Sequence, residues 1–131
     1  MEESLALIIV GSVLSLMGIA MNVNPIKFDE DLFGKLDGEL SERESYFRNI
    51  GAQLRCAIGA CVIALGIIAI YNRGLEKEDA ENLLVSMGIG FVILIGVITA
   101  GHFRGFVDKI VVPPLVIFTI LSVICFYAGL T

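Results

Sequence analysis

The chain has 131 residues, of which 56% are hydrophobic, with a mean hydropathy of +0.87 and a formal net charge of −5. An acidic chain with few aromatic residues and no polybasic patch does not fit a nucleic-acid-binding protein, because the phosphate backbone attracts basic surfaces. Long apolar runs leave no room within these residues for a soluble catalytic domain, so we expect the protein to work inside or beside membrane helices.

Four apolar runs define the predicted architecture. A helix needs roughly 20 residues to cross ~30 Å of hydrocarbon at about 1.5 Å per residue, and each run reaches this length with little to spare. We therefore predict an all-α, polytopic membrane protein: an antiparallel bundle of four transmembrane helices with a short amphipathic segment in the first loop. Residues 1–131 form this single domain, with spans at about residues 4–22, 48–72, 81–102 and 110–130.

The first span starts after Glu2 and Glu3, opposite in charge to the basic start of a signal peptide, so we expect a retained helix. In the connection that follows, the spacing of the apolar residues after Pro25 predicts a short amphipathic helix in the membrane interface. These apolar residues are Phe28, Leu32, Phe33 and Leu36.

A capping box marks the start of the second membrane helix. Ser41 and Glu44 have the spacing at which a hydroxyl and a carboxylate each satisfy a free backbone N–H, so the helix is predicted from about Glu42 to Tyr71. Its first two turns stand outside the hydrocarbon and need an anchor, because local side-chain pairs are weak. We expect three side chains to pack beneath the preceding loop: Tyr46, Phe47 and Ile50. The expected covering residues are Phe28, Leu32 and Phe33.

The later connections are shorter. Asn72-Arg73-Gly74 predicts a tight antiparallel hairpin between the second and third spans, and Pro113-Pro114 suit the first turn of the last helix, where missing N–H groups cost little. The fourth span carries no charge, so it can face lipid or a partner protein equally well.

The 14 glycines suit membrane helices, which approach one another closely at small residues. Small residues form one stripe on the second helix and a matching stripe on the third. Because these helices are hairpin neighbours, we expect the two stripes to meet. The glycines assigned to helix packing are Gly51, Gly59, Gly66, Gly88 and Gly96.

Charged residues interrupt the apolar faces of the second and third helices on one membrane side. Arg55 lies about one turn inside the apolar run, where an unpaired charge costs on the order of 3 kcal/mol, so its partner is expected across the bundle or in a ligand. Local pairs at i, i+4 are expected from Glu44 to Arg48 and from Arg104 to Asp108. The candidate ligand-binding residues are Arg48, Arg55, His102 and Arg104, with Glu44, Gln53 and Asp108 as supporting polar partners.

Two interpretations of this cluster stay open. In one, the arginines extend to lipid phosphates or cap carbonyl groups and fix the positions of the helices. In the other, they line a pocket open to one membrane face, which holds an anionic lipid or a quinone-type head group. A bound lipid or quinone is therefore the only cofactor expected.

No pattern points to other chemistry. Cys56, Cys61 and Cys125 all fall in apolar runs, without the C-x-x-C motif that membrane redox enzymes use. A single histidine and no Cys/His spacing do not match a zinc site. We therefore assign no catalytic residue and no metal ligand.

The balance of Lys and Arg at the membrane edges predicts orientation. The first and third connections, which share a side, hold Lys27, Lys35, Arg43, Arg48, Arg104 and Lys109. The other side holds Arg73 and Lys77. The count favours both termini outside a bacterial or archaeal cell membrane, provided that Arg48 and Arg104 do not point into the bundle.

A family resemblance follows from the second and third spans. Arg48-Asn49-Ile50-Gly51, Leu54-Arg55, Gly59 and Leu65-Gly66, followed by His102-Phe103-Arg104-Gly105, resemble the DoxX-like group of small four-helix membrane proteins, in particular an uncharacterised bacterial branch. The resemblance implies a single four-helix bundle that acts as a subunit of quinone-linked oxidoreductases or as an assembly factor. The positions carried over are Arg48, Gly51, Arg55 and Arg104.

A second family, the glutathione-linked membrane proteins of eicosanoid and glutathione metabolism, has an Arg-Asn pair followed by a Glu one turn later. Here Arg48-Asn49 is followed by Gly51-Ala52-Gln53, without that carboxylate.

The sequence therefore favours an accessory, structural or assembly subunit of a membrane complex, with lipid and other membrane subunits or further copies of the chain as partners. The alternatives are a membrane module that binds a ligand at the arginines and, third, a glutathione-linked membrane enzyme.

Overall fold

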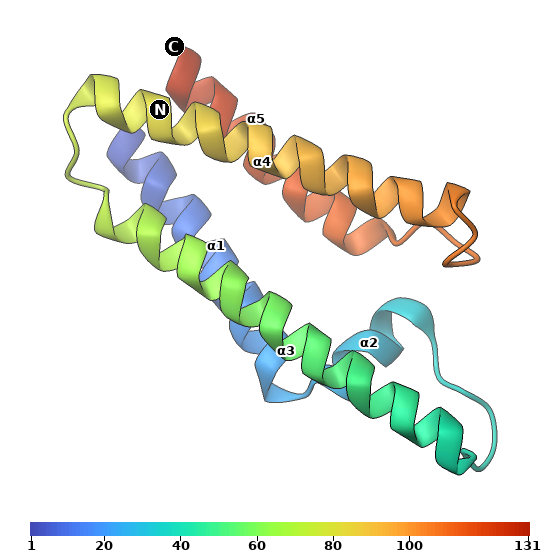
Figure 1. The fold of residues 1–131 in the computed structure, drawn as a ribbon. Helices are drawn as coiled ribbons and strands as arrows, with labels where there is room; N and C mark the ends of the chain where they lie inside the picture. The colour runs from blue at the N-terminus through green and yellow to red at the C-terminus, as the bar shows by residue number, and fades with distance from the viewer. The chain divides into compact units, whose positions relative to one another are not determined.

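The computed structural model describes all residues from Met1 to Thr131 and consists of five helices (Figure 1). Four of them are long and apolar enough to cross a membrane, which confirms the predicted all-α class. The fifth is the short helix predicted in the first connection. The helices are α1 (Glu3–Val23), α2 (Pro25–Phe33), α3 (Glu42–Tyr71), α4 (Lys77–Phe103) and α5 (Val112–Leu130).

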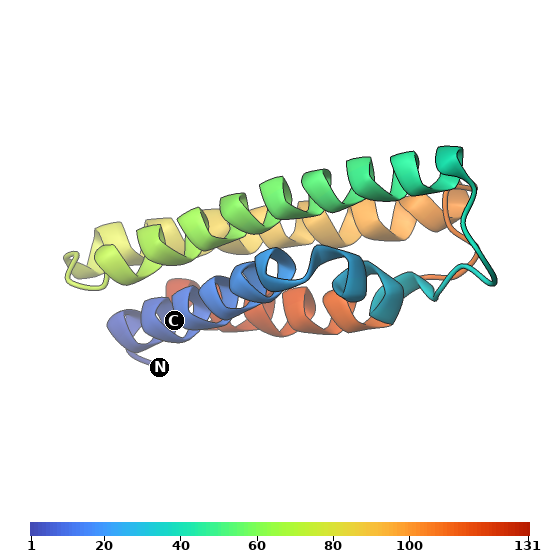
Figure 2. The ribbon, with the colours of Figure 1, turned by 90° about the horizontal axis from the view of Figure 1, so that it is seen from below.

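The residues fall into two compact units. Gly11–Ile68 form the α1–α3 unit, which also contains α2. Met1–Val10 together with Ala69–Thr131 form the α4–α5 unit. Figure 2 shows α2 following directly on α1. Asn24 is the one residue between the two helices.

Glycines bring α1 and α3 together in the α1–α3 unit. A Cβ atom on Gly18 would lie 2.5 Å from the carbonyl oxygen of Gly59, and one on Gly59 would lie 2.9 Å from the carbonyl oxygen of Gly18. A Cβ atom on Gly66 would lie 2.6 Å from the carbonyl oxygen of Gly11. The two helices therefore run antiparallel with their backbones in contact, as small residues allow in membrane helices (Figure 1).

This arrangement corrects two expectations about the glycines. Gly59 and Gly66 are packing residues, but the helix they contact is α1 and not the third span. The reason is spacing: α1 presents Gly11 and Gly18 two helical turns apart, the same step that separates Gly59 from Gly66. In contrast, Gly51 and Gly96 have open space where a Cβ atom would stand, so neither makes a close helix contact within its own unit.

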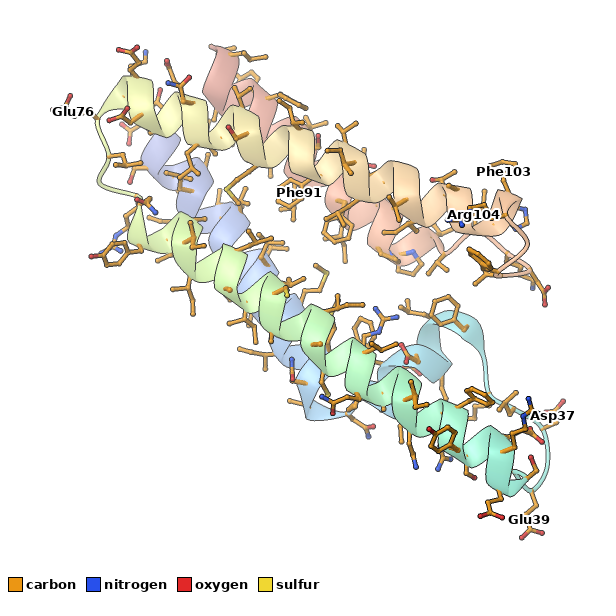
Figure 3. All side chains as sticks on the ribbon, in the orientation of Figure 1. Asp37, Glu39, Glu76, Phe91, Phe103 and Arg104 are labelled. Carbon is orange, nitrogen blue, oxygen red and sulfur yellow. The ribbon has the colours of Figure 1, made fainter.

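Large side chains hold α4 against α5 in the α4–α5 unit. Phe91, labelled in Figure 3, is buried on α4 and stacks on Phe118 of α5 with ring centroids 5.8 Å apart. Gly88 on α4 packs against the ring of Phe126. The carbonyl oxygen of Gly88 accepts a hydrogen bond of 3.3 Å from the Ser122 hydroxyl. The fourth span, although uncharged, therefore contains one buried polar residue, Ser122, whose hydroxyl faces α4.

The first residues of α1 belong to the same unit. Ala6, Leu7 and Val10 are buried. Lys77 at the start of α4 lies 4.0 Å from a carboxylate oxygen of Glu3 and 3.5 Å from one of Glu81. Negative side chains thus surround the single lysine at this helix start.

Candidate functional site

The structure gives α2 a definite beginning and end. Asn24 caps its first turn by accepting a hydrogen bond of 3.1 Å from the backbone N–H of Lys27, and Pro25 occupies the first turn, where no N–H is needed. At the other end, Gly34 has φ 91° and donates its N–H to the carbonyl oxygen of Glu30. The chain therefore turns away from the helix at Gly34, a conformation that favours glycine.

Arg55 is fastened to α2. Its Nε donates a hydrogen bond of 2.7 Å to Oδ1 of Asp29, and its guanidinium carbon lies 5.3 Å from the centre of the Phe28 ring. The two charged side chains are 19% and 30% exposed. A carboxylate and an aromatic face thus offset the cost of placing this arginine within an apolar run.

Sequence reasoning missed Asp29 as the partner of Arg55, which it expected across the bundle or in a ligand. Asp29 lies on α2, in the connection just before α3, and pairs with a residue 26 positions later. A usable signal was present: Asp29 lies on the short amphipathic helix that precedes α3 in the same connection, and Arg55 requires a carboxylate.

The start of α3 is capped, but differently from the predicted capping box. The backbone N–H of Glu44 donates to the Ser41 hydroxyl at 3.1 Å, as expected. The Glu44 carboxylate then accepts the hydroxyl proton of Ser41 at 2.9 Å and not a backbone N–H. Because Glu44 turns back to Ser41, it forms no ion pair with Arg48, and the expected i, i+4 pair is absent.

A cavity of about 520 Å³ lies between α2, the loop after it and the first turns of α3. We call it the α2–α3 pocket. Its apolar lining consists of Ile26, Phe33, Leu36, Leu40 and Phe47. Its charged lining consists of Asp29, Glu30, Lys35, Glu44 and Arg48, and Gly34, Gly38 and Gly51 complete the wall.

The pocket explains why the predicted anchoring of α3 is only partly right. Phe47 and Phe33 do line one cavity, yet they are 56% and 52% exposed, so they border it without closing it. Tyr46 and Ile50 are exposed and do not line it, which contradicts their expected packing beneath the loop. One helix face points at α2, and steps of three and four residues place 44, 47, 48 and 51 on that face but exclude 46 and 50.

The end of α4 has its own polar group. Gly105, with φ 78°, donates its N–H to the His102 carbonyl, and the Phe106 N–H donates to the Gly101 carbonyl. This pair of bonds is the Schellman motif, which ends a helix on a left-handed glycine. Phe103 and Arg104, labelled in Figure 3, are therefore exposed at the helix end, where the Arg104 guanidinium carbon lies 4.6 Å from the centre of the Phe106 ring.

The turn also decides the contacts of the neighbouring residues. His102 Nδ1 lies 3.1 Å from the Val107 carbonyl oxygen, so this ring nitrogen is engaged by the turn. Asp108 is not one helical turn beyond Arg104, since the helix has already ended, and the expected ion pair between them is absent.

The structure brings only some of the predicted site residues together. Arg48 and Glu44 line the α2–α3 pocket, and Arg55 lies beside it through its bond to Asp29. Gln53 is exposed on α3 and forms no side-chain hydrogen bond. His102, Arg104 and Asp108 belong to the other unit, and their convergence with the two arginines of α3 stays a prediction.

Cys56, Cys61 and Cys125 are free thiols, and no group of three His, Cys, Asp or Glu side chains is placed to hold a metal ion.

The chain is all-α, and four of its helices have the length and apolar composition of membrane spans, which is consistent with an integral membrane protein and compatible with contact to a lipid bilayer. Comparisons with protein-family models, with curated proteins and with solved structures find no match.

Proposed function

We propose that the protein is a membrane binding module that holds the polar head group of a membrane amphiphile in the α2–α3 pocket. The observation that carries the proposal is the pocket itself, where apolar and charged side chains line one cavity of about 520 Å³. Cavities of about this size that combine apolar walls with polar groups are typical of small-molecule sites.

The level of the pocket along α3 favours an amphiphile over a water-soluble ligand. The charged residues of α3 before Ile50 are Glu42, Arg43, Glu44 and Arg48, and beyond Ile50 only Arg55 interrupts the apolar run. The pocket thus lies where head groups meet hydrocarbon. A ligand with a polar head and an apolar tail satisfies both parts of its lining.

The two arginines of α3 have different roles in this proposal. Arg48 lines the pocket and forms no ion pair within the chain, so its charge is available to a ligand. Arg55 is already paired with Asp29 and acts as a positioning residue that holds α2, and hence one wall of the pocket, against α3. His102 and Arg104 are not needed for this site.

Native mass spectrometry of the protein, extracted in a mild detergent, tests the proposal. The wild-type protein is expected to retain a lipid or quinone, and Arg48→Ala is expected to lose it. Arg73→Ala is the matched control, because Arg73 is also exposed and its side chain contacts only the Ile70 carbonyl. Equal retention of the same species by all three proteins contradicts the proposal.

A second candidate function is an accessory or assembly subunit of a membrane complex, as the resemblance to the DoxX-like group implies. The observation that favours it is the apolar surface of α4 that α5 leaves exposed within their unit, where Ile89, Ile93 and Val97 are 51%, 61% and 65% exposed. Gentle extraction followed by identification of co-purifying membrane proteins tests it. A stable monomer without partners contradicts it.

A further inference from the structure

The charges around the α2–α3 pocket do not neutralise one another. Asp29 is bound to Arg55, which leaves two carboxylates, Glu30 and Glu44, and two cations, Lys35 and Arg48, in the lining. No nitrogen of these cations lies within ion-pair distance of these carboxylates. One cavity therefore presents separated charges of both signs.

The two carboxylates come from different elements of the pocket wall, and so do the two cations. Glu30 belongs to α2 and Glu44 to α3, while Lys35 belongs to the loop and Arg48 lies one turn beyond Glu44. An anionic head group would find the two cations but would also approach two carboxylates. A ligand that carries an anion and a cation a few bonds apart satisfies both sets.

We propose that the α2–α3 pocket selects a zwitterionic phospholipid with a primary ammonium group, of the phosphatidylethanolamine type, over an anionic phospholipid. The inference rests on the proposed function and names its ligand class. The phosphate pairs with Arg48 and Lys35, which suits the fork of N–H donors on a guanidinium. The ammonium donates hydrogen bonds to Glu30 and Glu44.

The carboxylates also distinguish ethanolamine from choline. A primary ammonium has N–H donors for carboxylate oxygens, whereas a quaternary ammonium has none. Glu44 still has acceptor capacity for such a donor, because only one of its oxygens accepts the Ser41 hydroxyl. The glycerol and the first acyl carbons contact the apolar lining, formed in part by Ile26, Leu36 and Leu40.

The test is lipid competition followed by native mass spectrometry. The delipidated full-length protein is exchanged into mixed micelles that hold equal amounts of phosphatidylethanolamine, phosphatidylcholine and phosphatidylglycerol with the same acyl chains. We expect phosphatidylethanolamine to be retained about tenfold over phosphatidylglycerol, the ratio that one additional charge-assisted hydrogen bond supplies.

Substitutions of glutamate by the uncharged, similarly shaped glutamine sharpen the test. The double variant Glu30→Gln, Glu44→Gln keeps the shape of the pocket and leaves Lys35 and Arg48 as the unpaired charges of its lining, so its preference should invert toward phosphatidylglycerol. The control is the double variant Asp37→Asn, Glu39→Gln, which removes the same amount of charge from the loop between α2 and α3 (Figure 3), at positions that do not line the pocket. It should keep the wild-type preference.

The outcomes separate the inference from the proposed function. Equal or stronger retention of phosphatidylglycerol by the wild-type protein overturns the zwitterion selection and leaves the binding site standing, and so does retention of phosphatidylcholine at the level of phosphatidylethanolamine. A retained quinone in place of phospholipid has the same meaning. If Arg48→Ala retains every lipid as the wild type does, the binding site itself is wrong. Thermal unfolding of each variant confirms that it is folded.

Discussion

The helix interfaces of the two units differ in the residues that fill most of the contact, although Gly129 also brings α5 close to the Glu81 carbonyl of α4. In the α1–α3 unit, glycines remove side chains from the interface, and backbone carbonyls fill the space where Cβ atoms would stand. In the α4–α5 unit, Phe91, Phe118 and Phe126 fill the interface. The first interface should fail when a residue is enlarged and the second when a residue is truncated, so the same kind of stability measurement can distinguish them.

One arginine in each unit, Arg55 and Arg104, can be compared in the same manner. Arg55 lies within an apolar helix and is held by a carboxylate and an aromatic ring, whereas Arg104 lies at a helix end over one aromatic ring. Because both residues are arginines, the difference follows from depth: a charge inside an apolar run needs a partner, whereas one at a helix end does not.

The largest effect is expected from truncation in the α4–α5 unit. Phe118→Ala removes a ring that is 5% exposed and stacked on Phe91, and the cavity should lower the free energy of unfolding by about 3 kcal/mol. Ile120→Ala, at a 54% exposed position on the same helix, is the control and should cost much less. Unfolding in mixed detergent micelles measures both, and equal losses would contradict the assignment of this face.

The second largest loss of stability is expected from Asp29→Asn. It leaves Arg55 without its carboxylate, at an expected cost of about 2–3 kcal/mol in the free energy of unfolding. The double variant Asp29→Asn, Arg55→Met should recover most of the loss, because removing both charges avoids an unpaired one. If the single variant is as stable as the wild type in the same unfolding experiment, Arg55 does not depend on Asp29.

Enlarging a glycine tests the α1–α3 interface. Gly59→Ala places a methyl group against the Gly18 carbonyl and Met21, and should cost about 1–3 kcal/mol through overpacking. Gly96→Ala meets open space and should instead be neutral or stabilising, since alanine favours helix. Equal thermal stability of the two variants would mean that α1 and α3 do not touch at Gly59.

The smallest effect is expected at the end of α4. Arg104→Ala loses one exposed cation–π contact with Phe106, worth about 0.5–1 kcal/mol. Arg55→Ala, compared with it in parallel denaturation curves, should be clearly more destabilising because it leaves Asp29 unpaired. A larger loss for Arg104→Ala would show that its charge has a partner that the chain alone does not supply.

Local pattern was sufficient for the elements themselves. The apolar runs and the Ser41 cap predicted the four long helices and the start of α3 at Glu42, because helix length and N-terminal capping depend on residues a few positions apart. The short helix after Pro25 was predicted for the same reason. The need of Arg55 for a partner was equally local, since it followed from depth in an apolar run.

Only the tertiary structure decided which residues meet. The spacing of Gly59 and Gly66 shows that they share a helix face, but it does not say which helix covers that face, and α1 provides the matching glycines. Asp29 is 26 residues from Arg55, a separation that no helical period connects. The face that α3 turns toward α2 places Phe47 and Arg48 in a pocket and leaves Tyr46 outside it, because a rotation about the helix axis is set by packing and not by sequence pattern.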